Sequence, residues 1–152
     1  QEGYIDYTFG GRAGPSVDVI NLFHELAHAA EFGPENFSER AYQCGFRFYV
    51  PKRWIYDRFC EESQTMQATD RELRTFAYHF HLLQLAGRKL KAQRFSAEQA
   101  RAMRFMPDWF CVPGEDDEAR TAYVQAETLQ YIEEIRPAEA LSRLTGWLDE
   151  TA

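Results

Sequence analysis

The sequence predicts a mainly α-helical fold with a small β component. Apolar residues recur at helical spacing along most of the 152 residues, and glycines and prolines interrupt these stretches. Only the opening segment 4–9 is rich in aromatic and β-branched residues, as strands are. With 45% hydrophobic and 15% aromatic residues, the chain can bury a substantial core. We therefore expect one compact α+β domain that spans residues 1–152.

The predicted elements are separated by clear stop signals. Gly10-Gly11 ends the strand, and Pro15 begins the first helix. Gly33-Pro34 ends that helix, because proline cannot continue it. Segment 38–50 fits either a buried helix or a helix that runs into a strand. Further helices are predicted at 52–67, 69–86, 96–107, 118–134 and 137–148.

The second half of the chain carries two predicted helix starts and two predicted buried faces. Residues 69–72 (Thr-Asp-Arg-Glu) and 96–99 (Ser-Ala-Glu-Gln) fit the capping box, in which a hydroxyl and an acidic or amide side chain satisfy the first helical N–H groups. The residues expected to face inward on the last two helices are Ala122, Ala126 and Leu129, then Leu141, Leu144 and Leu148.

Charge and cysteine content limit the partners and the compartment. The net charge of −7 argues against a nucleic-acid partner, because phosphate binding requires a basic surface. No stretch approaches the ~18 apolar residues of a membrane span, and the N-terminus does not resemble a signal peptide. Cys44, Cys60 and Cys111 are too widely spaced for a disulfide framework or a cysteine zinc site. We expect a cytoplasmic protein without a membrane partner, and numbering that begins inside a longer gene product.

The motif that carries chemistry is H-E-L-A-H at residues 24–28, within the first predicted helix. Two histidines four residues apart lie on one helical face, so both imidazoles can reach one divalent ion. Glu25 lies about a quarter turn away, where its carboxylate can act on a water bound to that ion. We predict His24 and His28 as metal ligands and Glu25 as a catalytic residue.

The alternative to a metal is a pair of histidines that are hydrogen-bonded in the core. Both lie on the apolar stripe that carries Val17 and Ile20, where an unpaired polar ring would be costly, so a metal is the simpler partner. The other two histidines, His79 and His81, are two residues apart and therefore point to different sides of their helix. We expect them to be surface or packing residues.

A catalytic site with two histidines needs a third protein ligand, most often a carboxylate from another segment. Glu62 is favoured, because it lies on the apolar stripe of segment 52–67, where a free carboxylate is disfavoured. Three alternatives stay open: Glu61 beside it, Glu72, which the capping box already explains, and Glu39, near a helix start.

Two histidines and one carboxylate do not fix the reaction. A Zn²⁺ ion with an open position suits hydrolysis, whereas the same ligand set forms the facial triad of non-haem Fe(II) oxygenases. The cofactor is therefore a divalent ion, either Fe(II) or Zn. Glu25 argues against a third reading, a non-catalytic, metal-stabilised interaction module, because a purely structural site has no need of that carboxylate.

The chain resembles the bacterial elongation factor P hydroxylase family. That family carries H-E-x-x-H on a helix, with a glycine five residues after the second histidine, where this chain has Gly33. Its aromatic run that ends in proline resembles segment 45–51. Its phenylalanine, followed by closely spaced acidic residues and a Gln-Ala pair, resembles segment 59–68. The C-terminal helices are similar in pattern around residues 123–127 and 135–137.

The resemblance implies a metal-dependent hydroxylase that acts on a modified lysine of elongation factor P, a protein substrate. Iron would be held by His24, His28 and Glu62, and Glu25 would orient water or oxygen, or relay a proton. The H-E-x-x-H helix is shared by zincin-type proteins, so a zincin-like domain with zinc peptidase activity is the alternative. In that case Glu25 is the general base.

Overall fold

The structure, a computed structural model, describes residues 15–34, 66–104 and 110–151. These ranges contain five helices and no strand: α1 (Pro15–Phe32), α4 (Met66–Leu85), α5 (Ala92–Arg104), α6 (Asp117–Glu134) and α7 (Pro137–Thr151). The mainly helical class is thus confirmed. The predicted strand 4–9, segment 38–50 and most of segment 52–67 lie outside the described residues. Within the described ranges, none of the helices combines the length and apolar character needed to cross a membrane.

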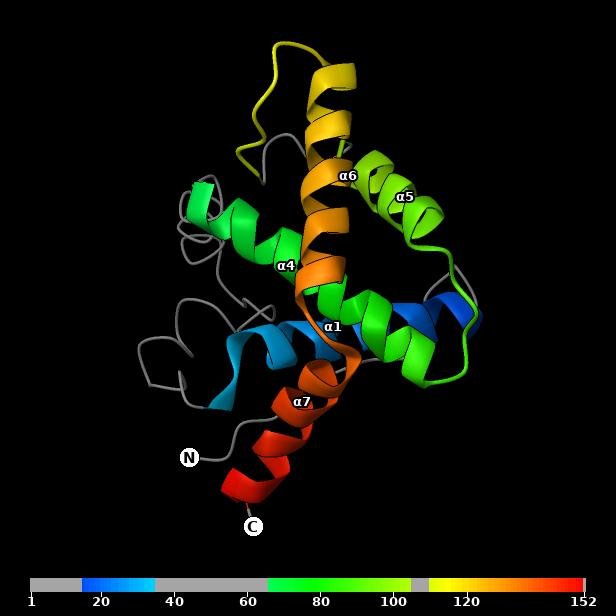
Figure 1. The fold of residues 1–152 in the computed structure, drawn as a ribbon, viewed down its shortest axis with the longest axis vertical. Coiled ribbons are helices and arrows are strands. Elements are labelled where there is room, and N and C mark those ends of the chain that lie inside the picture. The colour runs from blue at the N-terminus through cyan, green and yellow to red at the C-terminus, as the bar shows by residue number, and fades with distance from the viewer. Residues whose placement is uncertain (1–14, 35–65, 105–109, 152) are drawn as a thin grey trace.

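Helix α4 lies at the centre of the molecule, and the other four helices contact it (Figure 1). From Leu73 to Leu83 every residue except Arg74 is buried, so this part of α4 is covered on all sides. A helix that is covered all round needs mostly apolar residues, and the buried residues in this part of α4 are aromatic, aliphatic or small except for Thr75, His79 and His81. The fold therefore positions α1, which carries the H-E-x-x-H motif, directly against the central helix.

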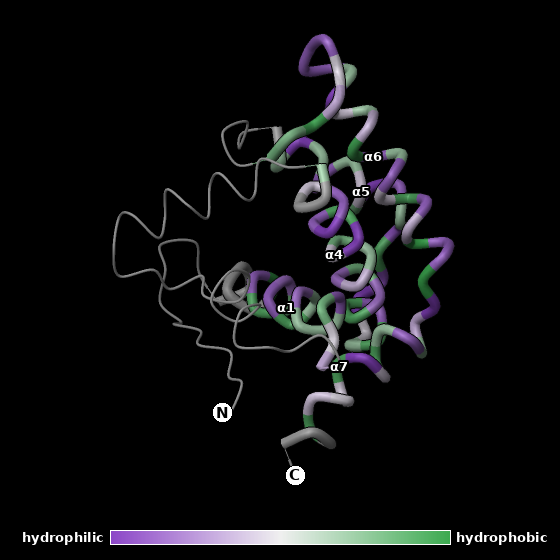
Figure 2. The backbone as a smooth tube through the Cα atoms, turned by 90° about the vertical axis from the view of Figure 1, so that its left-hand side faces the viewer, coloured by the Kyte–Doolittle hydropathy of each residue, from purple (hydrophilic) through white to green (hydrophobic). Residues whose placement is uncertain are grey.

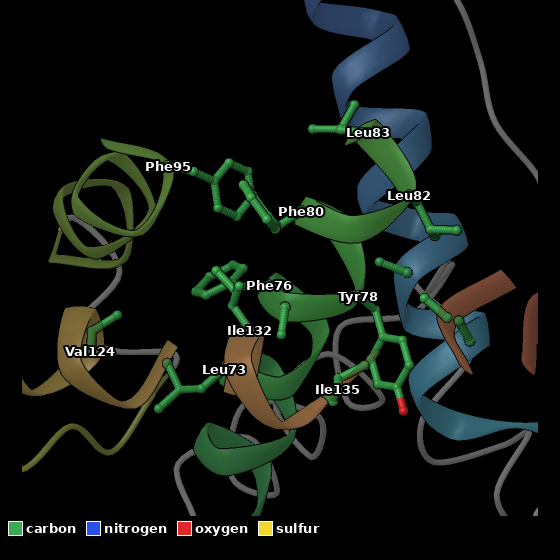
Figure 3. Packing of buried hydrophobic residues seen from close by; sticks show 14 of the residues in the cluster. Leu73, Phe76, Tyr78, Phe80, Leu82, Leu83, Phe95, Val124, Ile132 and Ile135 are labelled. Atoms are coloured by element: carbon green, nitrogen blue, oxygen red, sulfur yellow. The ribbon is translucent and has the colours of Figure 1, made fainter. Parts of the chain in front are cut away.

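Side chains from two sides of α4 build the core. Figure 3 shows Phe76 and Phe80 extending toward α5 and α6, where the Phe80 ring lies 5.5 Å from that of Phe95. Tyr78 and Leu82 extend toward the opposite side, where α1 and α7 pass. All of these side chains are at most 6% exposed. Burying one large apolar side chain stabilises a fold by about 1.5–3 kcal/mol, so this double-sided core holds α4 in place.

Several helix ends lie where the sequence predicts them. Helix α1 ends at Phe32, and Gly33 follows it with a φ of 76°, which glycine adopts at low cost. The Gly33 N–H donates to the Ala29 carbonyl at 2.9 Å. The N-cap of α6 is Asp116, whose carboxylate accepts from the Ala119 N–H at 2.7 Å. Helix α7 begins at Pro137, as expected for a residue that lacks an N–H.

Both predicted capping boxes are wrong. Helices α4 and α5 begin at Met66 and Ala92, so Thr69 and Ser96 lie inside them. The Ser96 hydroxyl instead donates to the Gln93 carbonyl at 3.0 Å, which is how a hydroxyl is satisfied within a helix. Both hydroxyl residues are fully buried, which a cap at an exposed helix end would not be.

The predicted inward faces of α6 and α7 are wrong in part. On α6 the buried residues are Val124, Thr128 and Ile132, whereas Ala122 and Ala126 are exposed. Val124, Thr128 and Ile132 follow one another at four-residue spacing and form one buried face, so Ala122 and Ala126 lie on other sides of the helix. Figure 2 shows hydrophilic and hydrophobic residues alternating along the helices that surround α4. On α7, Leu141 and Leu148 are exposed, while Leu129 of α6 and Leu144 are partly buried.

Helix α7 holds the C-terminal end of α1. The Arg143 guanidinium donates from Nε to the Ala30 carbonyl at 2.7 Å and from Nη2 to the Glu31 carbonyl at 2.8 Å. The Trp147 indole donates to the Ala29 carbonyl at 2.9 Å. These carbonyls belong to the last turn of α1, where backbone N–H donors run out, although the Ala29 carbonyl also accepts from the Gly33 N–H. The helix that carries the two motif histidines is therefore fixed at one end by α7.

Candidate metal centre

Two helices bring together the two motif histidines and one glutamate. His24 and His28 lie one turn apart on α1, and their ring centroids are 4.7 Å apart. Glu72 approaches both from α4: its Oε1 lies 3.0 Å from His24 Nε2, and its Oε2 lies 3.4 Å from His28 Nε2. The side chains of His24, His28 and Glu72 are 23%, 18% and 13% exposed. The group is thus mostly buried, and each of the three side chains keeps a small exposed fraction.

The spacing of these atoms suits one divalent ion. One ligand atom from each of the three residues can be chosen so that all lie within 4.8 Å of one another. In a tetrahedral zinc site with bonds of about 2.0–2.1 Å, neighbouring ligand atoms are about 3.3 Å apart. The two nitrogen to oxygen distances, 3.0 Å to Oε1 and 3.4 Å to Oε2 of Glu72, are close to that separation. Two imidazoles and one carboxylate are also a donor set that zinc and Fe(II) accept.

Charge at the centre is set by burial and by the His24–Glu72 contact. Burial alone would lower the pKa of His24, but the hydrogen bond and charge of Glu72 outweigh burial and raise that pKa above its ordinary value. Burial would raise the pKa of Glu72, but His28 and the His24 hydrogen bond outweigh it and hold that pKa below its ordinary value. Without an ion, Glu72 is therefore an ionised carboxylate that accepts a hydrogen bond from the Nε2–H of His24. A divalent ion held by these residues would take the place of that proton.

His28 differs from His24 in both charge and contacts. Burial lowers its pKa to about 4, although the charge of Glu72 opposes this. Its Nδ1 lies 3.3 Å from the Thr75 hydroxyl, one turn along α4 from Glu72. The ring is therefore neutral at physiological pH, and neutral imidazole is the form that binds metals.

Glu25 is a second carboxylate beside the centre but does not belong to the three-residue group. Burial raises its pKa, His24 opposes the rise, and the charge of Glu72 reinforces it. A carboxylate whose pKa is raised in this way is a better proton acceptor than a free glutamate side chain. Glu25 thus has the properties of a base that acts next to the centre rather than those of a ligand.

The two histidines of α4 point to different sides, as predicted, and both are buried packing residues. His81 Nε2 contacts the Ile132 carbonyl of α6 at 3.0 Å. The ring of His79 faces α1, with its centroid 5.2 Å from that of His24. Neither His79 nitrogen has a hydrogen-bond partner of good geometry within the described residues, although the Ile20 carbonyl is close enough to affect its pKa. Burial dominates and lowers the pKa of His79 to about 3.

The structure brings Glu72 to the motif, and the other candidate ligands, Glu62, Glu61 and Glu39, lie outside the described residues. The prediction that a capping box accounts for Glu72 is wrong, because its carboxylate reaches His24 and Thr69 is not a cap. The sequence contained a signal for Glu72 that the capping box concealed. Phe76, His79 and Leu83 follow it at i+4, i+7 and i+11, so it lies on a largely apolar helical stripe. The same argument favoured Glu62 in the preceding segment.

Comparisons of the chain with protein-family models, with curated proteins and with solved structures found no match. The assignment of a function to this centre therefore depends on its residues and their geometry.

Proposed function

We propose that this protein is a metal-dependent hydrolase of zincin-like architecture. In this proposal His24, His28 and Glu72 hold a divalent zinc ion, and Glu25 is the general base. The observation that carries the proposal is the arrangement of two different carboxylates. Glu72 meets both imidazoles from a second helix, while Glu25 stays outside that group with a raised pKa.

A bound zinc ion would supply a Lewis acid that lowers the pKa of water and polarises a carbonyl group. Glu25 would take a proton from the attacking water and deliver it to the leaving group. The partial burial of Glu25 supports this role, because a base works best when its pKa lies near the working pH. Two histidines and one glutamate are the zinc ligands of several metallopeptidases, so peptide bonds are the proposed substrate class.

Hydroxylation of a protein is the second candidate, because the same three residues match the facial triad of non-haem Fe(II) enzymes. The resemblance to the elongation factor P hydroxylase family supports this reading and supplies its substrate, a modified lysine on elongation factor P. In this case Fe(II) replaces zinc. Glu25 then orients water or oxygen, or relays a proton.

The two candidates are separated by measuring metal content, peptide hydrolysis and dioxygen consumption on one preparation expressed without added metal. A mixture of fluorogenic peptides tests hydrolysis, and elongation factor P carrying the modified lysine tests hydroxylation by a mass increase of one oxygen atom. For a hydrolase, Glu25→Gln should keep the metal and lose about 10²–10⁴-fold in rate.

Two results would contradict the hydrolase. Dioxygen consumption that depends on the modified substrate, without peptide cleavage, would establish the hydroxylase instead. Loss of the metal in Glu25→Gln would show that Glu25 is a ligand or a structural residue, and not the base.

A further inference from the structure

The buried hydroxyl of Thr75 contacts the second histidine of the motif. Thr75 is 0% exposed and lies three residues after Glu72 on α4, so both side chains face α1. Its Oγ1 lies 3.3 Å from His28 Nδ1 and 2.8 Å from the Arg71 carbonyl oxygen. One hydroxyl thus connects the imidazole of α1 with the backbone of α4.

The number of protons determines the direction of these two hydrogen bonds. A hydroxyl has one proton to donate and two lone pairs that accept. A carbonyl oxygen can only accept a hydrogen bond. The Thr75 hydroxyl therefore donates its proton to a hydrogen bond with the Arg71 carbonyl oxygen, which is the shorter of its two contacts. The contact with His28 then requires the ring Nδ1–H to donate to Oγ1. In a neutral imidazole with a proton on Nδ1, the lone pair that can bind a metal ion is on Nε2.

That lone pair is on the side of the ring where a metal ligand is needed. His28 Nε2 faces Glu72, and the nitrogen to oxygen distance of 3.4 Å exceeds the usual 2.7–3.2 Å range of an N–H···O hydrogen bond. His24 differs, because its Nε2 lies 3.0 Å from Glu72 and makes a hydrogen bond. Of the two imidazoles, it is therefore that of His24 that makes the strong hydrogen bond with the Glu72 carboxylate.

We propose that Thr75 is a positioning residue that holds His28 in the Nδ1–H tautomer and fixes its ring, so that Nε2 is directed at the metal centre. This inference rests on the proposed centre of His24, His28 and Glu72. Helix α4 then has two tasks, since it supplies one ligand and orients another. Hydrogen bonds to the far nitrogen of a ligating histidine commonly set its tautomer and orientation in this way. The opposing influence is Glu72, whose negative charge draws a proton to Nε2.

The test uses three variants of the full chain. Thr75→Val keeps the shape of the side chain and removes the hydroxyl. Thr75→Ser keeps the hydroxyl and removes the methyl group. Thr69→Val is the matched control, because Thr69 is also fully buried on α4 and its Oγ1 has no hydrogen-bond partner within the described residues. Thermal unfolding of each variant first verifies that it folds.

The first readout is the tautomer of His28 in the metal-free protein, from long-range ¹H–¹⁵N correlation spectra with ¹⁵N-labelled histidine. Wild type, Thr75→Ser and Thr69→Val should show the proton on Nδ1, and Thr75→Val should shift it toward Nε2. The second readout is zinc affinity, measured in competition with a chromophoric chelator. Thr75→Val should bind zinc roughly 10- to 100-fold more weakly, the usual effect of losing such a partner, while Thr75→Ser and Thr69→Val stay near wild type.

Two results would overturn the inference. One is a wild-type His28 with its proton on Nε2. The other is zinc binding by Thr75→Val that is as tight as that of Thr69→Val. A wild-type protein that binds no divalent ion would contradict the proposed function itself. The metal-free spectra would still decide whether Thr75 sets the His28 tautomer.

Discussion

Replacing Glu72 with alanine should remove tight metal binding while the helical fold is kept. A metal at 100 times its dissociation constant stabilises the wild-type fold by about 2.7 kcal/mol. Losing a residue that only supports a ligand can cost about 100-fold in affinity, and losing a ligand should cost at least as much. At the same metal concentration, a 100-fold weaker variant gains only about 0.4 kcal/mol. The variant should therefore lose most of the stabilisation by metal.

The metal-free protein should also respond to Glu72→Ala. Glu72 accepts a hydrogen bond from His24 at 3.0 Å, and its side chain is only 13% exposed. Hydrogen bonds to charged groups contribute about 1.5–3 kcal/mol, and removing a buried charge offsets part of this. We expect the free energy of unfolding without metal to fall by about 1–2 kcal/mol, which leaves most of the core unaffected.

Urea unfolding with and without zinc measures both effects on one set of proteins. Glu62→Ala and Glu39→Ala remove the carboxylates of two other candidate ligands. Glu98→Ala removes an exposed carboxylate and is the control for the loss of one negative charge. If zinc stabilised the Glu72→Ala variant as much as it stabilises wild type, Glu72 would not be a ligand. If Glu62→Ala alone lost the zinc effect, the third ligand would lie on segment 52–67, as the sequence first indicated.

Three further changes test other parts of the structure. His79→Leu should flatten the pH dependence of the free energy of unfolding. Burial lowers the pKa of His79 in the folded protein to about 3, so only the unfolded chain takes up a proton at this residue between pH 7 and 5. In wild type this uptake should lower the free energy of unfolding by about 2 kcal/mol as the pH falls over that range. An unchanged pH profile in acid titrations would contradict this. Gly33→Ala should cost about 1–2 kcal/mol in thermal unfolding, because φ at this position is 76°. Arg143→Ala should cost about 1–3 kcal/mol and increase amide exchange in the last turn of α1, because the Ala30 and Glu31 carbonyls lose the hydrogen bonds that Arg143 donates. Equal exchange in wild type and variant would refute this role of Arg143.

Local signals allowed the helices to be predicted from the sequence. Pro15, Gly33 and Pro137 mark three helix ends that the structure confirms, because these residues act on the backbone next to them. Capping boxes are weaker signals, since Thr69 and Ser96 can be buried within a helix equally well. Which face of a helix is buried depends on its neighbours, and the sequence therefore did not show that Ala122 is exposed and Val124 buried.

The candidate site was predictable to the extent that it lies on one helix. The spacing of His24 and His28 specifies their common face without any knowledge of the rest of the chain. The partner of that face comes from α4, and pairing two helices is a tertiary event that local patterns do not encode. Glu72 is among the candidate ligands, but a capping box accounts for it equally well from the sequence. Thr75 carries no signal in the sequence, because a single threonine within a helix has no evident role until the facing histidine is placed.

The hydrogen bonds from α7 to the last turn of α1 have a consequence for how the protein is made. They join residues 112 to 118 positions apart in the chain. Ribosomes add about 5–20 residues per second, so α7 is synthesised on the order of 10 s after α1. During that interval the motif helix lacks its C-terminal anchor, and contacts of such long sequence separation form slowly. The centre between α1 and α4 should therefore reach its final geometry only after α7 has docked. A chain arrested before residue 137 should bind zinc more weakly than the released protein.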